Sequence, residues 1–598
     1  MTTSPVFNEA LTLHRQNKLP EAENFYRQVL AAEPDNFYAW HWLAVLHFQQ
    51  DRGSDALAAV EKALKINPHV AEASMLRGVL LQAAGRREEA RAAILRATAL
   101  NPANAEGWYN LGLIQNDLKY FDDAVAAFDR AWALQPMAHG WHNRGIALQG
   151  LKRYAEALDS FDRTIALAPG ALPALYGRGE ALLELGRCLE AVAAFDQLLA
   201  HDPAVYAAWN NRGAAQQRLG QFTESLASYD KALELQPDFA PSWSNRANAL
   251  WGLKRYEEAL SSQDKALEMA PDFVQAWVFR SAVLFAMQRY PESLASLDRA
   301  LAIEPDNESA LFARGAVLCE SGRIAEGLCV YREHAERIYA RHEFFVRADL
   351  DFKRRHDQEQ REYLAAEGVA PGKYHLAAGP RVPGHAVNPH PEAQVQWQKS
   401  NPKMVVIDDF LSPEALEGLR QYCWGSTFWQ DIHADGYLGA MPESGFGCAL
   451  LAQIAEELQS RYPAIFAGHG LRKLWAFKYD SSLTGINVHA DPAAVNVNFW
   501  ITPDEANLDP EHGGMVIWDI TAPLDWNFIQ YNGDVPATRA FLAGAGARSQ
   551  TVPYRANRVV IFDSDLFHET DVIAFKEGYL NRRINVTLLF GRRVADGS

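Results

Sequence analysis

The sequence has few cysteines, no run of basic residues and no long apolar segment. Its five cysteines are scattered over 598 residues without a Cys-x-x-Cys pair, which favours a reducing cytosol over a disulfide framework. The formal net charge is -17 at pH 7, and such a chain repels the phosphates of nucleic acid. A signal peptide and an apolar run long enough to cross a membrane are both missing. We therefore expect a cytoplasmic protein that binds neither nucleic acid nor membrane.

Prolines recur at a nearly constant interval through the first half of the chain. They lie at positions 34, 68, 102, 136, 169, 203, 237, 271 and 305. Between them run two amphipathic helical patterns, one like Trp108–Gly112 and the other like Ala124–Phe128. Small residues let the two helices of a unit approach closely, and proline ends the second helix. The pattern resembles the tetratricopeptide repeat, which implies an all-α superhelical solenoid of about nine repeats.

Three regions follow from this resemblance and from changes in composition. We assign residues 1–337 to the solenoid, with a degenerate tenth unit after Asp306 that we expect to cap it. Residues 338–403 are expected to form a linker, helical through Leu364 and loop-like from Gly368 to Pro402. Residues 404–598 form a second domain with several strand-like segments.

Asparagine recurs at the sixth position of the first helix in four repeats, a position that normally faces the concave side of such a solenoid. These residues are Asn110, Asn143, Asn211 and Asn245. A side-chain amide both donates and accepts, so a row of them can hold an extended peptide whatever its side chains. The row is similar to the asparagine ladder in O-GlcNAc transferases. Alternatively, asparagine is simply common at this position. The arginines that often follow at position seven are interpreted as pairing between repeats.

A His-x-Asp pair and a distant histidine lie in strand-like segments of the second domain. In a strand His489 and Asp491 point the same way, and His568 supplies a second imidazole. Two imidazoles and one carboxylate cover one face of an octahedral ferrous ion and leave three positions open. A second His-x-Asp, formed by His433 and Asp435, is followed by glycine and is interpreted as a loop.

An arginine stands at the start of the last strand-like segment. Strand periodicity puts Arg583, Asn585 and Thr587 on one face, with apolar residues on the other. An arginine on the inward face of a barrel strand needs an anion, and its planar fork suits a dicarboxylic cosubstrate.

These ordered pieces resemble the Fe(II)/2-oxoglutarate dioxygenase superfamily, in its prolyl-hydroxylase-like branch, from about Met404 to Arg593. The resemblance implies a double-stranded β-helix (jelly-roll, cupin-like) fold. It also implies Fe(II) bound by the two histidines and the aspartate, O₂ as oxidant, and 2-oxoglutarate chelated to the iron.

The same resemblance assigns the cosubstrate contacts. The 5-carboxylate of 2-oxoglutarate is expected on Arg583, with Tyr479 and Thr587 nearby. The interval from His568 to this arginine is longer than prolyl hydroxylases usually show, so Arg582 is a competing candidate.

Two further regions of the second domain carry expectations. Asn496, Asn498 and Trp500 alternate with apolar residues and are expected to face the site. There Asn498 either binds cosubstrate or substrate, or belongs to a polar network that fills the barrel. A loop-rich insertion between Asp519 and Arg558 is a candidate substrate lid, or else a spacer contacting the solenoid. Its aromatic residues include Trp526, Phe528 and Tyr531.

The sequence therefore predicts a dioxygenase that hydroxylates a polypeptide recruited by the solenoid. Leprecan-type prolyl 3-hydroxylases pair the same two modules, but they are secretory. One alternative is an interaction scaffold with an inactive oxygenase domain, which the complete ligand set disfavours. Another is a small-molecule oxygenase whose repeats serve assembly. A related halogenase is disfavoured because Asp491 fills the position a halide would need. The substrate, its hydroxylated position and the oligomeric state stay open.

Overall fold

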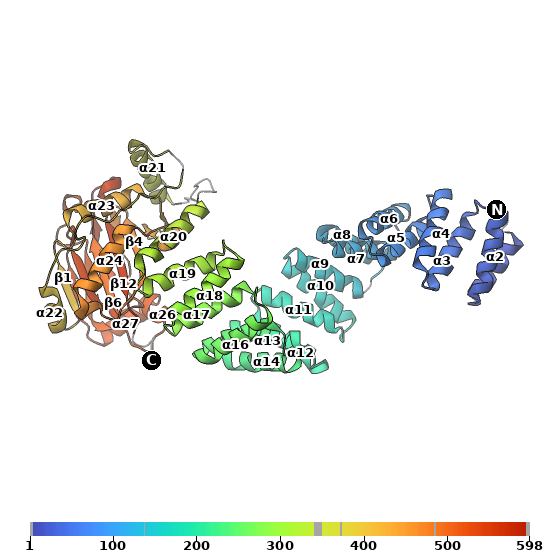
Figure 1. Cartoon of the computed structure of the whole chain (residues 1–598), viewed down its shortest axis with the longest axis horizontal. Helices are drawn as coiled ribbons and strands as arrows, with labels where there is room; N and C mark the ends of the chain where they lie inside the picture. Colours follow the sequence, from blue (N-terminus) through green and yellow to red (C-terminus); the bar gives the residue numbers. More distant parts are fainter. Residues whose placement is uncertain are drawn as a thin grey trace. The chain divides into compact units, whose positions relative to one another are not determined.

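The computed structural model describes residues 4–136, 138–339, 350–370, 373–433, 435–483 and 486–593. The chain forms two compact units, Met1–Met269 and Ala270–Ser598, and each is described by itself (Figure 1). Among the described residues, strands occur only in the second unit. No described helix combines the length and the apolar character needed to cross a membrane.

Ten consecutive helix pairs make up the described repeats. In the first unit they are α1 (Pro5–Arg15), α2 (Leu19–Ala32), α3 (Phe37–Gln49), α4 (Gly53–Ile66), α5 (Ala71–Ala83), α6 (Arg87–Leu100), α7 (Ala105–Asp117), α8 (Phe121–Leu134), α9 (Ala138–Gly150), α10 (Tyr154–Leu167), α11 (Leu172–Glu184), α12 (Cys188–His201), α13 (Tyr206–Arg218), α14 (Phe222–Leu235), α15 (Ala240–Gly252) and α16 (Tyr256–Met269). The second unit begins with α17 (Val274–Ala286), α18 (Tyr290–Ile303), α19 (Glu308–Glu320) and α20 (Ile324–Tyr339).

The two helices of a repeat touch where a glycine of the first meets an aromatic ring of the second. A Cβ added at Gly112 would lie 2.6 Å from the Phe128 ring, and one at Gly179 would lie 2.5 Å from the Phe195 ring. Those separations are shorter than any ordinary carbon contact, so only glycine permits this interhelical distance. The small and large residues of the repeat thus pack as the sequence predicts.

Neighbouring repeats are joined by an arginine at position seven of the first helix. Arg212 donates to Asp196 of the preceding repeat at 2.7 Å and to Ser228 of its own second helix at 2.8 Å. The same two bonds recur at Arg144 and Arg246. The predicted pairing between repeats is confirmed, and it fixes the register of each repeat on the one before it.

The rest of the second unit contains helices, short 3₁₀ turns and three sheets. The helices are α21 (Asp351–Ala366), α22 (Glu392–Lys399), α23 (Pro413–Gly425), α24 (Ala449–Arg461), α25 (Pro463–Phe466), α26 (Phe528–Asn532) and α27 (Val535–Gly544), and the 3₁₀ turns are η1 (Pro442–Ser444), η2 (Asp504–Ala506) and η3 (Tyr579–Asn581). The strands are β1 (Met404–Ile407), β2 (Trp429–His433), β3 (Tyr437–Ala440), β4 (Leu471–Tyr479), β5 (Ser482–Leu483), β6 (Val495–Trp500), β7 (Met515–Thr521), β8 (Ser549–Val552), β9 (Val559–Asp563), β10 (Leu566–Thr570), β11 (Ile573–Ala574) and β12 (Ile584–Phe590).

These strands form the double-stranded β-helix expected from the sequence. The larger sheet has the antiparallel order β1-β9-β6-β12-β4-β3-β2. Opposite it lie the β10-β7-β8 and β11-β5 sheets. An isolated bridge between His489 and His568 adds the His-x-Asp segment to the smaller side.

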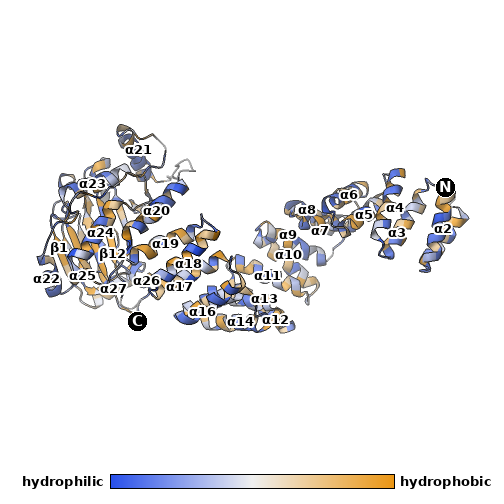
Figure 2. Cartoon of the chain, viewed as in Figure 1, coloured by the Kyte–Doolittle hydropathy of each residue, from blue (hydrophilic) through white to orange (hydrophobic). Residues whose placement is uncertain are grey.

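Side chains of the larger sheet alternate between two different environments. Val497 and Val586 belong to an outer apolar core that also contains residues of α23 and α24. The intervening positions, such as Asn498 and Thr587, are buried but polar and point inward. Figure 2 shows the strands of this sheet as mainly hydrophobic. The two-residue period of a strand therefore separates the stabilising core from the site.

The segment before β1 differs from the expected linker. Residues 386–387 are buried, and their amides donate to the Glu457 carboxylate on α24. On α21, Gln360 donates to Ser426 O and to the Tyr579 hydroxyl, both at 2.8 Å. The described residues 373–391 are irregular, as expected from their proline and glycine content, but they pack against the barrel, and α22 follows them.

The tenth repeat is also not a free cap. Arg592, just after β12, donates to Glu320 of α19 at 2.6 Å and to the carbonyls of Phe285 and Ala286 at the end of α17. A Cβ at Gly470 would lie 2.0 Å from the Glu320 carbonyl oxygen. The last two repeats and the barrel are therefore packed backbone against backbone.

This packing predicts where the chain can be divided. A protein starting at residue 404 should aggregate or remain unfolded, because it loses the partners of Arg592, α21 and the buried segment at 386–387. One starting at residue 270 should be soluble and unfold cooperatively, because it keeps all of them. Far-UV circular dichroism and thermal melting of the two proteins measure this. A stable, folded 404–598 fragment would show that the last repeats are dispensable.

Candidate metal centre and its cavity

Three side chains converge at the open edge between the two sheets. The ligand atoms of His489, Asp491 and His568 all lie within 4.8 Å of one another, and no other group of this kind occurs among the described residues. His568 lies on β10, and its Nε2 is 3.4 Å from Asp491 Oδ2. His489 is not in a regular strand as expected. It forms a single bridge, donating to His568 O at 2.9 Å and accepting from His568 N at 2.8 Å.

Both imidazoles are oriented by backbone carbonyls. His489 Nδ1 lies 2.7 Å from the Asn487 oxygen, and His568 Nδ1 lies 3.0 Å from the Leu566 oxygen. A carbonyl can only accept, so each Nδ1 carries the proton and each Nε2 keeps its lone pair. Burial lowers the pKa of His489 to about 4, and the nearby His568 adds to this effect. His489 is therefore a neutral ligand at physiological pH.

The carboxylate is held in place by an inward residue of β6. Asn496 Nδ2 donates to Asp491 Oδ2 at 2.8 Å, and both side chains are buried. Burial raises the pKa of Asp491, but its contact with His568 and the proximity of His489 and Lys473 outweigh burial and lower the pKa overall. Asp491 is thus an anion fixed toward the two imidazoles.

The competing His-x-Asp pair has different surroundings. His433 ends β2 rather than lying in a loop, stacks on Tyr437 with ring centroids 4.2 Å apart, and bonds to Asp431 Oδ2 at 3.1 Å. Asp435 lies in the following turn. The pair has no third ligand among the described residues.

Arg583 is buried without an acidic partner. It is 1% exposed, and it donates to the carbonyls of Gly513 at 2.7 Å and Gly514 at 3.1 Å. Its guanidinium carbon lies 4.7 Å from the Tyr479 ring centre and 5.7 Å from that of Trp500. Its Nη1 and the indole Nε1 of Trp500 are buried donors without a hydrogen-bond partner among the described residues. Two unsatisfied donors beside a desolvated cation fit a carboxylate.

Arg582, the competing candidate, points elsewhere. Its guanidinium pairs with Glu359 at 3.0 Å and with Asp480 at 2.5 Å. Its charge is therefore already compensated by side chains of the protein. The parity argument from the sequence and these contacts both distinguish Arg582 from Arg583.

The other predicted cosubstrate residues form a buried polar cluster. The Thr587 hydroxyl accepts from Asn498 Nδ2 at 3.2 Å and from Asn585 Nδ2 at 3.3 Å. The Oδ1 atoms of both asparagines are buried without a partner among the described residues. Tyr479 is fully buried, and its hydroxyl lies 3.4 Å from Thr570 Oγ1. The cluster is a barrel-filling network, yet it retains free acceptors that face the metal centre.

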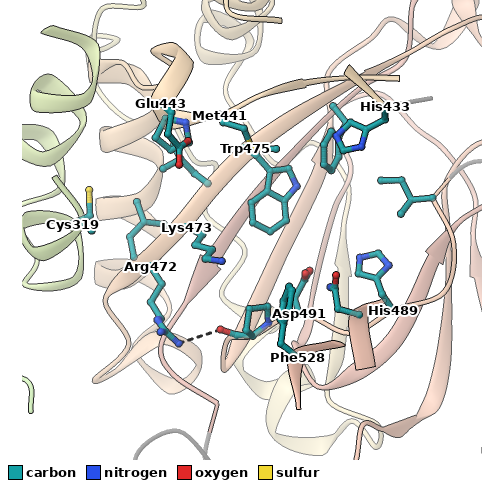
Figure 3. Close-up of a pocket in the computed structure, with 18 of the residues that line it drawn as sticks. Cys319, His433, Met441, Glu443, Arg472, Lys473, Trp475, His489, Asp491 and Phe528 are labelled. Carbon is teal, nitrogen blue, oxygen red and sulfur yellow. Dashed lines mark hydrogen bonds between the residues drawn. The ribbon is translucent and has the colours of Figure 1, made fainter. Parts of the chain in front are cut away.

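A cavity of about 710 Å³ opens beside His489 and Asp491. Its walls include Trp475 and Phe477 from β4, Phe528 from α26, and Phe312 and Cys319 from α19. Figure 3 shows Cys319 on a solenoid helix across the cavity from the strand that carries Lys473 and Trp475. The cavity is therefore bounded by the last repeat on one side and the barrel on the other.

The insertion predicted as a lid lies at this opening. It contains α26, α27 and β8, and Phe528, Asn532, Gly533 and Val535 line the cavity. Asn532 Nδ2 donates to Ala490 O at 3.0 Å, between the two ligands of the His-x-Asp segment. The insertion is thus tied directly to the metal centre.

The four asparagines of the repeats contact the preceding repeat. Asn143 donates to the Tyr109 hydroxyl at 2.9 Å, Asn211 to the Tyr176 hydroxyl at 3.0 Å, and Asn245 to Asn210 Oδ1 at 3.1 Å. Asn110 Nδ2 lies 3.9 Å from Met75 Sδ. Each amide group thus helps to join repeats, and the peptide-ladder role stays a prediction.

The sequence did not reveal the roles of three residues of the site. The two-residue period of the strand predicts that Asn496 faces the site, but it does not predict its hydrogen bond to Asp491. Phe312 and Glu320 of the last repeat line the cavity. No motif marks them, because their role depends on how α19 packs on the barrel.

Comparisons with known proteins identify the repeats. Tetratricopeptide-repeat profiles match residues 13–80, 75–139, 138–171, 176–238, 215–272 and 282–340. This part of the chain therefore consists of tetratricopeptide repeats, modules of protein interaction. A search of curated proteins finds no match.

Several solved structures are similar to part of this chain. YrrB, described as a TPR protein with an unusual peptide-binding site, is 24% identical over 31% of this chain and 95% of its own, with a TM-score of 0.29. A tetratricopeptide repeat protein from Parabacteroides merdae is 17% identical over 42% and 98%, with a TM-score of 0.36. Yeast Tom70 is 13% identical over 55% and 91%, with a TM-score of 0.31.

The geometry predicts one divalent metal ion per chain. His489→Ala should lower affinity for Co(II), a spectroscopic probe for such sites, by at least about a hundredfold, because one of three ligands is lost. Asn496→Ala should lower it by about tenfold, because Asp491 loses its orienting bond. Metal titration monitored by absorbance measures both affinities. His433→Ala is the matched control and should bind Co(II) with the affinity of the wild-type protein. If His433→Ala weakened Co(II) binding and His489→Ala did not, the metal site would belong to the other His-x-Asp pair.

Proposed function

We propose that this protein is an Fe(II)- and 2-oxoglutarate-dependent dioxygenase that hydroxylates a polypeptide substrate. One observation carries the proposal: two free imidazole Nε2 atoms and a carboxylate converge in the same barrel that buries Arg583 without a counter-ion. In the overall reaction a substrate C–H becomes C–OH, while O₂ and 2-oxoglutarate are converted to that hydroxyl oxygen, succinate and CO₂.

When bound, iron would enable O₂ to oxidise both 2-oxoglutarate and the substrate C–H bond. The protein's task is to hold the ligands on one face and leave the others accessible. His489 and His568 present Nε2 because their Nδ1 protons are donated to carbonyls. Asp491 is kept anionic and oriented by Asn496. These groups are fixed before any ligand arrives, which favours an open, preorganised site.

Arg583 is suited to bind the far carboxylate of the cosubstrate. Burial lowers the pKa of this guanidinium, whereas the nearby tyrosine hydroxyls and Asp571 raise it. A dicarboxylate that reached Nη1 and the Trp500 indole would satisfy both unpaired donors at once. The oxygens left free on Asn498 and Asn585 do not favour an anion, so they fit water or the substrate better than a carboxylate.

The solenoid argues for a polypeptide substrate. Tetratricopeptide repeats are modules of protein interaction, and α17 and α19 of the last repeats line the cavity that contains His489 and Asp491. A cavity of about 710 Å³ is large enough to hold a side chain together with its flanking backbone. A role in assembly alone would not require the repeats to reach the metal centre.

The proposal predicts how Arg583 affects turnover. The protein loaded with Fe(II) should release succinate from 2-oxoglutarate slowly even without substrate. Arg583→Ala should raise the KM for 2-oxoglutarate roughly 30- to several-thousand-fold, because a buried charge-assisted pair costs on the order of 2–5 kcal/mol to lose. Succinate release measures the KM, and metal titration checks that Co(II) affinity is retained.

Arg582→Ala is the neighbouring control. It should change the KM for 2-oxoglutarate only slightly, because Arg582 pairs with Glu359 and Asp480 on another face. No succinate release from iron-loaded wild-type protein would remove the proposed activity. A larger effect at Arg582 than at Arg583 would assign the anchor to the other side chain.

A further inference from the structure

The segment that carries two of the three metal ligands is paired as a strand only at its first residue. His489 exchanges both backbone hydrogen bonds with His568. The backbone of Asp491 is bonded to Ser564, the residue after β9: Asp491 N donates to Ser564 O at 3.1 Å, and Ser564 Oγ donates to Asp491 O at 3.2 Å. The residues on either side of Asp491 have no strand partner, so their carbonyls are held by other parts of the chain.

The insertion holds the residue between the two ligands. Ala490 N donates to Tyr531 O at 3.0 Å, and Asn532 Nδ2 donates to Ala490 O at 3.0 Å. Tyr531 is itself buried, and the guanidinium carbon of Arg593 lies 4.5 Å from the centre of its ring. Both backbone polar groups of Ala490 are therefore bonded to the end of α26, and Asn532 also lines the cavity.

An arginine of β4 holds the residue after Asp491. Arg472 Nη1 donates to Pro492 O at 3.2 Å, a hydrogen bond that Figure 3 shows as a dashed line. Arg472 lies where the register between β4 and β12 shifts by one residue, and such a bulge re-aims side chains. Arg472 and the next residue, Lys473, both line the cavity, although neighbours in a regular strand point to opposite faces. The bulge thus lets Arg472 reach the metal-binding segment from the cavity wall.

A glutamate of the last repeat holds the same arginine. Glu320 Oε2 lies 3.6 Å from Arg472 Nε, and Glu320 Oε1 lies 2.6 Å from Arg592 Nε. The Glu320 side chain is only 5% exposed, so solvent screens this contact less than it screens a surface ion pair. A continuous set of contacts therefore runs from α19 through Glu320 and Arg472 to Pro492.

We propose that Arg472 and Asn532 are positioning residues of the metal centre, and that the last repeat acts on Asp491 through Glu320 and Arg472. One backbone bridge would leave the peptide groups around Asp491 free to turn, and fixing the carbonyls on both sides removes that freedom. The inference rests on the metal centre of the proposed function. It gives the repeats a role in the geometry of that centre besides the recruitment of substrate.

The test uses the full chain and Co(II), whose visible absorption depends on the geometry of its ligands. Arg472→Ala and Asn532→Ala should each lower the affinity for Co(II) by about tenfold, because Asp491 is less firmly oriented. Both variants should also change the absorption spectrum at saturating Co(II), where every chain carries the metal. Metal titration and the saturated spectrum measure the two effects separately.

Matched controls remove the same side-chain types from backbone carbonyls outside the cavity lining. Arg420 donates to Ile501 O at 2.5 Å, and Asn388 donates to Asp409 O at 2.7 Å. Arg420→Ala and Asn388→Ala should therefore lower the melting temperature and leave the Co(II) affinity and spectrum unchanged. Wild-type spectra in the two test variants would overturn the inference. Equal changes in test and control variants would indicate general loss of structure and would overturn it as well.

Peptide-free succinate release separates positioning from cosubstrate binding. Per bound Fe(II), Arg472→Ala should lower kcat about tenfold and leave the KM for 2-oxoglutarate within about twofold, because Arg583 keeps its contacts. Arg472→Lys can still donate to Pro492 O, so it should recover most of the lost Co(II) affinity. A higher KM with an unchanged kcat in Arg472→Ala would assign this residue to cosubstrate binding instead of positioning.

A double-mutant cycle tests the link to the last repeat. Glu320→Gln should lower the Co(II) affinity about threefold in the wild-type background and have no further effect in the Arg472→Ala background. The loss of thermal stability caused by Glu320→Gln should persist in both backgrounds, because Arg592 loses the same partner in each. Equal losses of Co(II) affinity in the two backgrounds would remove the last repeat from the positioning of the metal.

Failure of this inference is distinguishable from failure of the proposed function. Wild-type protein that binds Co(II) but releases no succinate would remove the oxygenase, and the Co(II) affinities and spectra of the variants would then decide the inference alone. Wild-type protein that binds no Co(II) would overturn both. Succinate release together with unchanged Co(II) binding in Arg472→Ala and Asn532→Ala would overturn only the positioning role.

Discussion

A buried guanidinium without a carboxylate partner is the interaction around which the barrel is organised. Desolvating a cation costs several kcal/mol, and two glycine carbonyls and two aromatic rings offset only part of that cost at Arg583. The neighbouring arginine shows the usual solution, since Arg582 is paired with two acids. Arg583 has no such ion pair among the described residues, and its Nη1 is a buried donor without a hydrogen-bond partner there.

The junction between repeats and barrel is a second constraint, because it makes the last repeat part of the unit that contains the barrel. Glu320 on α19 is shared by Arg592 and Arg472, so it is simultaneously a residue of the tenth repeat and of the cavity wall. Gly470 must lack a side chain for the α19 backbone to approach. The last repeats are thus part of the scaffold that positions β4, whose inward residues Lys473 and Trp475 face the metal centre.

Much of the fold and of the candidate site could be predicted from the sequence, because both depend on residues that recur at regular intervals. The proline interval and the glycine–aromatic pattern specify the repeats, and the two-residue alternation in β6 and β12 specifies which polar groups point inward. The sequence does not reveal long-range packing. The segment at 386–387 is irregular, as expected for a loop, but Glu457 of α24 binds its amides and holds it on the barrel. His489 points toward Asp491 and His568 as predicted, although it does not lie in a regular strand. A single backbone bridge to His568 holds it there.

The asparagine row illustrates how a sequence pattern can serve two purposes. An amide has two N–H groups and one oxygen, and the bonds of Asn143 to Tyr109 and of Asn245 to Asn210 use one N–H of each donor. Asn211 donates to Glu180 as well as to Tyr176, and its oxygen accepts from Asn210. Joining repeats and binding a peptide are therefore compatible for Asn143 and Asn245. At α19, position six is occupied by Ala313 instead, and the neighbouring Phe312 and Ala316 face a cavity. In the last repeat an apolar wall beside the cavity thus stands in place of the amide hydrogen bonds of the earlier repeats.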